Sequence, residues 1–205
     1  ALTREALALA EGLAALSPGL RQTERDVVIC RGELTKLLVG IGAMAEAKGH
    51  AEQILAFAEK EFARQPEHRQ AGWDMAMASQ RLAQVLDGLG RPKEALVHAR
   101  NSFAHCMALA QSEPDEKTAA GYRKEGHDNL PPALFAAGLL DEGDAATAAA
   151  VAWVSERMDQ VPEADRASLQ LALLLHRIRQ GEARADGVSL APLYQEMRNV
   201  IQRRF

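Results

Sequence analysis

The chain has little cysteine. Its two cysteines, Cys30 and Cys106, lie far apart in 205 residues, each in a segment of helical periodicity. Isolated cysteines provide neither the disulfide framework of small secreted domains nor the paired spacing of a structural zinc site. We expect two free thiols, with one disulfide between them as the alternative, and a reducing, cytoplasmic compartment.

Aromatic residues and long apolar runs are scarce as well. Phe, Trp and Tyr together make up 4% of the sequence, which favours closely packed, alanine-rich helices over a β-sandwich. No apolar run approaches the roughly 18 residues of a membrane span. The first residues include Arg4, Glu5 and Glu11, and therefore lack the apolar core of a signal peptide.

A basic stripe is also missing. The formal net charge is -4, whereas a surface that binds nucleic acid needs clustered Lys and Arg. The basic C-terminal end, with Arg198, Arg203 and Arg204, is too short to supply one. The sequence therefore excludes a general nucleic-acid partner.

The motifs of common catalytic sites are absent, including phosphate-binding loops and nucleophile elbows. His98 and His105 are two helical turns apart, whereas two zinc ligands on one helix usually lie three to five residues apart. Residues 141–144 (Asp-Glu-Gly-Asp) lack the register and the distal Glu of a calcium loop. We therefore predict no enzyme, no metal site and no cofactor.

Two further clusters have both a functional and a structural interpretation. Glu125, His127 and Asp128 could form an acid–base group, but a double proline follows at 131–132 and favours a solvated turn. The stretch 73–77 holds one tryptophan and two methionines. We expect these side chains in the core rather than on a binding surface.

Most of the sequence favours helix formation. Hydrophobic residues make up 47% and charged residues 25%, enough to build a core and too apolar for disorder. In residues 82–114 apolar side chains repeat with a helical period, Gly90 and Pro92 interrupt them, and a second helical stretch ends at Pro114. This stretch predicts an antiparallel helical hairpin.

The hairpin pattern recurs along the chain. Aligning the glycine between the two helices gives three copies, at Gly49, Gly90 and Gly143, spaced by 41 and then 53 residues. Each copy has a small residue seven positions before the glycine. Each copy is closed by a proline: Pro66, Pro114 and Pro162. The agreement exceeds what an alanine-rich helix would show by chance.

At these positions the chain resembles the tetratricopeptide-repeat family, whose helix-turn-helix units stack into a superhelix. The family's tryptophan in the first helix is replaced by Leu38, Ser79 and Pro132, and the spacing exceeds the family's 34 residues. The first spacing, 41 residues, is seven residues longer than the family's, which is about two helical turns. The added residues therefore lengthen the helices without rotating their faces. A long-helix variant of the family is therefore the closer likeness.

The resemblance implies an all-α fold, a right-handed α-solenoid of antiparallel helix hairpins, in one domain over residues 1–205. The expected units are a trailing second helix at 1–18, repeat pairs at 22–66, 67–114 and 115–162, and a C-terminal capping pair at 163–205. The first unit suggests either a fragment of a longer protein or a capping helix on a complete domain. In the first pair we expect helices over 22–47, with Thr23 as the N-cap, and over 50–65. In the third pair we expect residues 129–132 to end or kink the first helix. In the C-terminal pair we expect helices over 165–180 and 190–204, separated by a loop at 181–187, with Val200 and Ile201 facing inward.

In this family the first helices line an inner groove, and their polar inward residues contact the ligand. By register the groove positions here are Lys36, Val39, Ala43, Met77, Gln80, Gln84 and Asp87. Gln80 and Gln84 are one turn apart and could both hydrogen-bond an extended peptide. Only Lys36 and Arg81 are basic here and Asn is missing, so we do not predict the family's clamp for a C-terminal carboxylate. The structural alternative is an exposed polar helix face.

The function predicted from these features is a non-catalytic scaffold that binds a protein or peptide and forms the C-terminal part of a larger bacterial-type protein. The first alternative is a sensing domain that changes on binding a small molecule or signal peptide and controls an upstream effector. The second is an enzyme on a helical scaffold. Neither the partner nor the oligomeric state can be deduced from the sequence.

Overall fold

The structure is a computed structural model that describes residues 2–158, 171, 174–175, 177–178, 180–182, 184 and 189–204. Over these residues every regular element is an α-helix, which confirms the all-α prediction. None of the helices described is both long enough and apolar enough to cross a membrane.

The chain divides into two compact units, Ala1–Leu109 and Ala110–Phe205. The helices of the first unit are α1 (Leu2–Leu16), α2 (Arg21–Gly40), α3 (Met44–Arg64), α4 (Arg69–Gly88) and α5 (Pro92–Ser112), whose last residues belong to the second unit. The second unit holds α6 (Glu116–Ala136), α7 (Leu140–Met158) and α9 (Ala191–Arg204).

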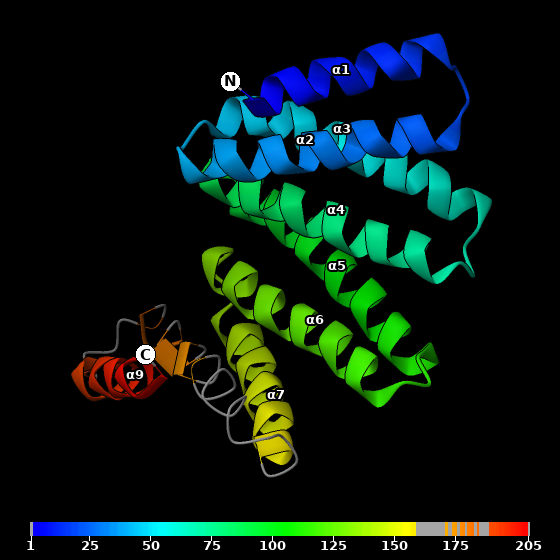
Figure 1. The fold of residues 1–205 in the computed structure, drawn as a ribbon. Coiled ribbons are helices and arrows are strands. Elements are labelled where there is room, and N and C mark those ends of the chain that lie inside the picture. Colours follow the sequence, from blue (N-terminus) through cyan, green and yellow to red (C-terminus); the bar gives the residue numbers. More distant parts are fainter. Residues whose placement is uncertain are drawn as a thin grey trace. The chain divides into compact units, whose positions relative to one another are not determined.

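Consecutive helices pack against each other. In the first unit α1 contacts α2, α2 contacts α3, and α3 contacts α4 (Figure 1). The first helices of successive hairpins, α2 and α4, also contact each other. In the second unit α6 packs along α7. Neighbour-to-neighbour packing of this kind is typical of a helical repeat protein.

The turn of each hairpin is built on a glycine in the left-handed conformation. These glycines are Gly42 (φ 76°), Gly90 (φ 71°) and Gly138 (φ 80°). The amide after each glycine donates to a carbonyl five residues earlier, as in Ala43 N to Leu38 O at 2.8 Å, which is a Schellman cap. The glycines are 48 residues apart in both steps.

The predicted alignment on Gly49, Gly90 and Gly143 is therefore wrong in its first and third copies. Gly49 lies inside α3 and Gly143 inside α7, where neither forms a turn. The first turn, at Gly42, lacks the following proline that marks the turn at Gly90, so its glycine was aligned as a small helical residue. The true repeat is 48 residues, not 41 and 53.

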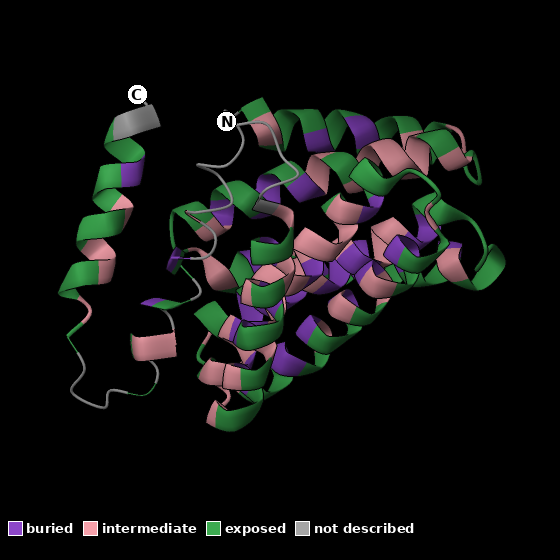
Figure 2. Cartoon of the chain, turned by 90° about the horizontal axis from the view of Figure 1, so that it is seen from below, coloured by how far each residue is buried: buried purple, intermediate pink, exposed green. Residues whose placement is uncertain are grey.

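Buried and exposed residues lie on different sides of the same helices (Figure 2). Burial follows the same 48-residue period. Leu38, Leu86 and Leu134 are 2%, 3% and 3% exposed. One position is buried in all of α1, α3, α5 and α7, where it is filled by Ala10, Ala58, Cys106 and Val154. By this register α1 occupies the place of a second helix, because its buried residues Leu7 and Ala10 match Leu55 and Ala58 of α3.

We predicted that the double proline ends or kinks the helix. It does not end it, since α6 continues through Pro131 and Pro132. Each proline removes one backbone hydrogen bond. Pro131 is buried at the position that Thr35 and Ala83, both buried, occupy in the two earlier hairpins. Packing along α7 therefore outweighs the two lost hydrogen bonds.

Bounds predicted for the first pair also differ. Its first helix was expected at 22–47 with Thr23 as the N-cap, but α2 ends at Gly40 and its N-cap is Leu20. The Thr23 hydroxyl donates to the Leu20 carbonyl at 2.8 Å instead. The second helix was expected to start near residue 50 and starts at Met44. Both errors follow from placing the turn at Gly49.

Predictions for the C-terminal pair are tested only in part. Pro162 and most of the helix expected at 165–180 lie outside the described residues. Residues 181, 182 and 184 are helical, so the loop expected at 181–187 is wrong there. In α9 Val200 is buried as predicted, whereas Ile201 is 40% exposed.

Candidate ligand-binding face of α2 and α4

A pocket of about 410 Å³ lies between α2 and α4. We call it the glutamine pocket, and its lining residues are Thr35, Lys36, Val39, Met77, Gln80, Arg81 and Gln84. Five of the seven groove residues expected from the sequence therefore lie together. The other two do not line it: Ala43 is half-buried in the turn before α3, and Asp87 is exposed in the last turn of α4.

A second pocket, of about 260 Å³, continues along the same two helices, and we call it the tryptophan pocket. From α2 it is lined by Arg25, Val28, Ile29 and Glu33, from α3 by Ile54, Phe57 and Ala58, and from α4 by Gln70, Trp73, Asp74, Met77, Ala78 and Arg81. Trp73, Met75 and Met77 are half-buried, and Trp73 and Met77 line the pocket. The prediction that these side chains lie in the core rather than on a binding surface is therefore not confirmed. Met77 and Arg81 line both pockets and lie where the two meet.

The 48-residue repeat explains why these side chains share a face. Lys36 matches Gln84, and Glu33 matches Arg81, since each pair is 48 residues apart. The predicted spacing of 41 differs from 48 by seven residues, or about two helical turns. Five of the predicted residues therefore share one face although the predicted register is wrong.

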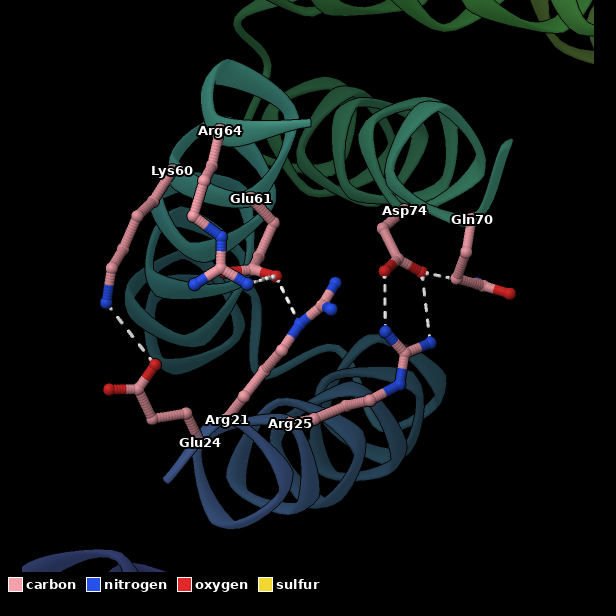
Figure 3. Close-up of polar contacts among 8 residues, drawn as sticks. All are labelled: Arg21, Glu24, Arg25, Lys60, Glu61, Arg64, Gln70 and Asp74. Carbon is pink, nitrogen blue, oxygen red and sulfur yellow. Dashed lines mark hydrogen bonds and ion pairs between the residues drawn. The ribbon is translucent and has the colours of Figure 1, made fainter. Parts of the chain in front are cut away.

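An ion pair joins α2 to α4 beside the tryptophan pocket. Arg25 donates to both carboxylate oxygens of Asp74, with distances of 2.9 Å and 3.4 Å (Figure 3). The side-chain amide of Gln70 donates to the same carboxylate at 2.8 Å. A bidentate pair of this kind fixes the relative position of the two helices. In this pair the charges of Arg25 and Asp74 also neutralise each other.

Lys36 and Glu33 form a second pair, along α2, with 2.7 Å between Nζ and Oε1. The hydrogen bond from Lys36, and then the positive charges of Lys36 and Arg81, hold the pKa of Glu33 below its ordinary value, while slight burial acts in the opposite direction. Glu33 therefore stays ionised near neutral pH and balances one cation of the face.

Among the residues that the structure describes, Arg81 is the cation of this face that forms no direct ion pair. Its guanidinium lies over the backbone of α2 at Gly32, where an added Cβ would be 2.1 Å from Nη1. Within the described part of the chain, Arg81 makes no hydrogen bond or ion pair. Burial lowers the pKa of Arg81 and the charge of Glu33 partly offsets this, but a guanidinium remains protonated at any physiological pH.

A different charge cluster anchors the start of α2 to the end of α3. Glu61 is buried, and its carboxylate lies 2.6 Å from Nε of Arg21 and 3.4 Å from Arg64 (Figure 3). Nearby, Lys60 pairs with Glu24 at 3.3 Å. These contacts satisfy a buried carboxylate and hold the hairpin together, so we assign them a structural role.

A third pocket, of about 350 Å³, lies among α1, α2 and α3. Its charged groups are partnered within the protein. Arg31 donates to Glu11 at 2.6 Å and to Gln53 at 2.8 Å, and Glu24 pairs with Lys60. Since these groups already neutralise each other, this pocket is a weaker candidate for a charged ligand than the α2–α4 face.

His98 and His105 lie in packed surroundings that indicate a structural role. His105 packs edge-on against Phe62, with 5.0 Å between ring centroids. Burial lowers the pKa of His98 and of His105, and for His98 the charges of Glu59 and Glu94 partly offset it. In the described ranges, no group of three or more His, Cys, Asp or Glu side chains is arranged to hold a metal ion.

Two other sequence clusters prove to be helical. His127 lies on α6 with its ring 5.6 Å from that of Trp153, so the predicted solvated turn is wrong. Arg157 lies over the same tryptophan at 4.8 Å from the ring centroid. Asp141 lies in the first turn of α7 and pairs with Arg184 at 3.2 Å.

Comparison with other proteins adds no relative. No family model, no curated protein and no solved structure matches this chain. Neither Cys30 nor Cys106 forms a disulfide.

Proposed function

We propose that this chain is a non-catalytic binding domain that holds an extended segment of a partner protein along the α2–α4 face. The observation that supports this most is the glutamine pocket, since Lys36, Gln80 and Gln84 line it together with apolar Val39 and Met77. Apolar side chains can cover a peptide's side chains, while amides hydrogen-bond its backbone. This combination is typical of a peptide-recognition groove.

The arrangement of the face suits an extended ligand. The glutamine and tryptophan pockets follow one another along the same pair of helices and share Met77 and Arg81. Gln80 and Gln84 are four residues, or about 6 Å along the helix axis, apart, while an extended peptide rises about 3.3 Å per residue. Two amides can therefore reach backbone groups of nearby peptide residues.

A selection from a displayed library of random twelve-residue peptides tests this proposal, using the whole chain as bait. The enriched peptides are then synthesised with both ends capped, and their Kd is measured by fluorescence anisotropy. Changing Gln80→Ala and Gln84→Ala together should weaken binding about thirtyfold, because each lost hydrogen bond contributes on the order of 1 kcal/mol and about 1.4 kcal/mol is tenfold in Kd. Helicity should be retained, since alanine is a good helix former.

The matched control is Gln111→Ala with Gln202→Ala, two exposed glutamines on α5 and α9. This double variant should bind the peptides as the unmodified chain does. Failure to enrich any peptide, or an equal loss in both double variants, would refute the proposal.

A small-molecule sensor is the second candidate function. The volume of the glutamine pocket, about 410 Å³, lies within the range of about 300–1,000 Å³ typical of small-ligand sites. A metabolite that raises the melting temperature of the chain, but not that of the Gln80→Ala, Gln84→Ala variant, would favour this candidate. A peptide that does the same would favour the first.

We further propose that the chain is a long-helix relative of the tetratricopeptide-repeat family with right-handed winding. Helices of 20 or 21 residues in α2 to α6 and the contact between α2 and α4 support this assignment. The lack of a disulfide at Cys30 and Cys106 supports a reducing, cytoplasmic location. An experimental structure of the whole chain tests the winding, and fractionation of the source cells tests the location.

A further inference from the structure

We infer that Arg81 is the specificity-determining residue of the α2–α4 face and that it binds the carboxylate of an Asp or Glu side chain within the bound peptide. This inference rests on the proposed function, because it names the ligand chemistry of the same face. The structure supports it through three features: the charge balance of the face, the position of the guanidinium and the openness of the groove on both sides of it.

Over the described ranges, each charged side chain of the face forms an ion pair with another one, except for Arg81. Arg25 is held by Asp74 with two contacts, and Lys36 is held by Glu33. Within the described residues this leaves Arg81 without an ion-pair partner, at the junction of the two pockets. A half-buried guanidinium without a partner is a ready site for an anion, because pairing restores the interactions it loses on leaving water.

The size of the unbalanced charge favours a carboxylate over a phosphate. One carboxylate carries one negative charge and can accept two parallel hydrogen bonds from a guanidinium. A phosphoryl group carries about 1.5 to 2 negative charges at neutral pH. The excess would face Glu33, which stays ionised on the neighbouring turn of α2. A singly charged side chain therefore matches the face and a phosphorylated one does not.

The position of Arg81 indicates a residue inside the peptide rather than a chain end. Pocket space continues on one side toward Trp73 and on the other toward Gln84, and Arg81 lines both parts. A peptide whose carboxylate meets Arg81 can therefore extend in both directions along the groove. This geometry differs from a clamp that closes around a C-terminal carboxylate.

Gly32 provides a way to move the guanidinium without changing charge. An alanine at this position would place its Cβ 2.1 Å from Nη1 of Arg81, and the flexible end of the arginine must shift away. Gly32→Ala therefore tests whether the position of the guanidinium matters while its charge is retained. Arg81→Met removes the charge but keeps the apolar stem of the side chain.

The experiment measures capped, selected peptides against the unmodified chain, Arg81→Met, Gly32→Ala and the charge-matched control Arg91→Met, an exposed arginine of the α4–α5 turn. We expect a fixed Asp or Glu in the enriched peptides. Replacing it by Asn or Gln should weaken binding to the unmodified chain by about tenfold or more, since a hydrogen bond to a charged group contributes more than a neutral one. The same replacement should cost less than about twofold with Arg81→Met or Gly32→Ala, whereas Arg91→Met should behave as the unmodified chain.

Several results would overturn the inference. One is a set of peptides that depends on Gln80 and Gln84 but not on Arg81, which would leave the proposed function intact. Another is tighter binding when phosphoserine replaces the acidic residue. A third is binding only by peptides with a free C-terminus. If no peptide binds at all, the proposed function fails as well. Circular dichroism of each variant confirms that it is folded.

Discussion

Alanine substitutions at Gly42 and Gly49 should change stability in opposite directions. Gly42 has a φ of 76°, and an alanine in this left-handed region costs about 1–2 kcal/mol. No other side chain or backbone atom lies within 4 Å of the added Cβ, so the cost comes from the backbone alone. Gly49 lies inside α3, also with open space around its Cβ. Alanine there should stabilise the helix by about 0.8–1 kcal/mol.

The difference between the two variants should be about 2–3 kcal/mol, which corresponds to roughly 5–10 °C in melting temperature for a chain of this size. The chain has two tryptophans, one in each compact unit. A Trp153→Phe background therefore leaves Trp73 as a fluorescence reporter of the unit that contains both glycines. Thermal unfolding followed by this signal gives the two shifts.

The reasoning fails if Gly49→Ala lowers the melting temperature by as much as Gly42→Ala. That result would indicate that the first hairpin turn lies at Gly49, and it would contradict the 48-residue repeat. Gly90→Ala provides a second test and should resemble Gly42→Ala. Gly143→Ala is not suitable, because its Cβ would lie 2.4 Å from the ring of Phe135.

Two further predictions concern charged and titratable groups of the first unit. Arg21→Met should destabilise the chain by about 2–3 kcal/mol in urea unfolding, below the 3–5 kcal/mol of a fully buried pair, because Arg21 is partly exposed and Glu61 retains a second partner. Adding Glu61→Leu should restore most of the loss, since the matching position of α5 is the buried Leu109; no recovery would argue against the register. The pKa of His98 is below its ordinary value in the folded chain, so the unfolded chain takes up the proton first as the pH falls. The contribution of His98 to the free energy of unfolding should therefore be complete above pH 6.5 and decrease below it. His98→Gln should make the free energy of unfolding depend less on pH between pH 7.5 and 5.5, and an unchanged slope would contradict this.

The second hairpin shows what the sequence could predict. Gly90 and Pro92 mark the turn from both sides, and the helices on either side have a clear apolar period, so α4 and α5 were predicted within about two residues of their bounds. Local sequence was sufficient here because the cap and the start of the next helix are both encoded in adjacent residues.

The first and third hairpins show where local signals fail. The turn at Gly42 has no proline after it, and the prolines within α6 look like a break although packing maintains the helix. The signal that resolves both is the long-range spacing of the closing prolines. Pro18, Pro66, Pro114 and Pro162 are 48 residues apart at every step, which fixes the register without reference to any glycine.

The candidate site was predictable as a face but not as a charge pattern. Helical periodicity placed Lys36, Gln80 and Gln84 on one shared face, and all three line the glutamine pocket. The isolation of Arg81 depends on which cations are paired elsewhere, and the partner of Arg25 is 49 residues away at Asp74. Pairing across helices requires the three-dimensional register, which the 41-residue alignment did not provide.

Hydrogen exchange followed by mass spectrometry, with and without a selected peptide, tests the binding face most directly. If the peptide lies between α2 and α4, protection should increase in segments that cover residues 32–40 and 73–88, and remain unchanged in α7 and α9. Protection confined to α1, to α5 or to the second unit would contradict a binding role for this face.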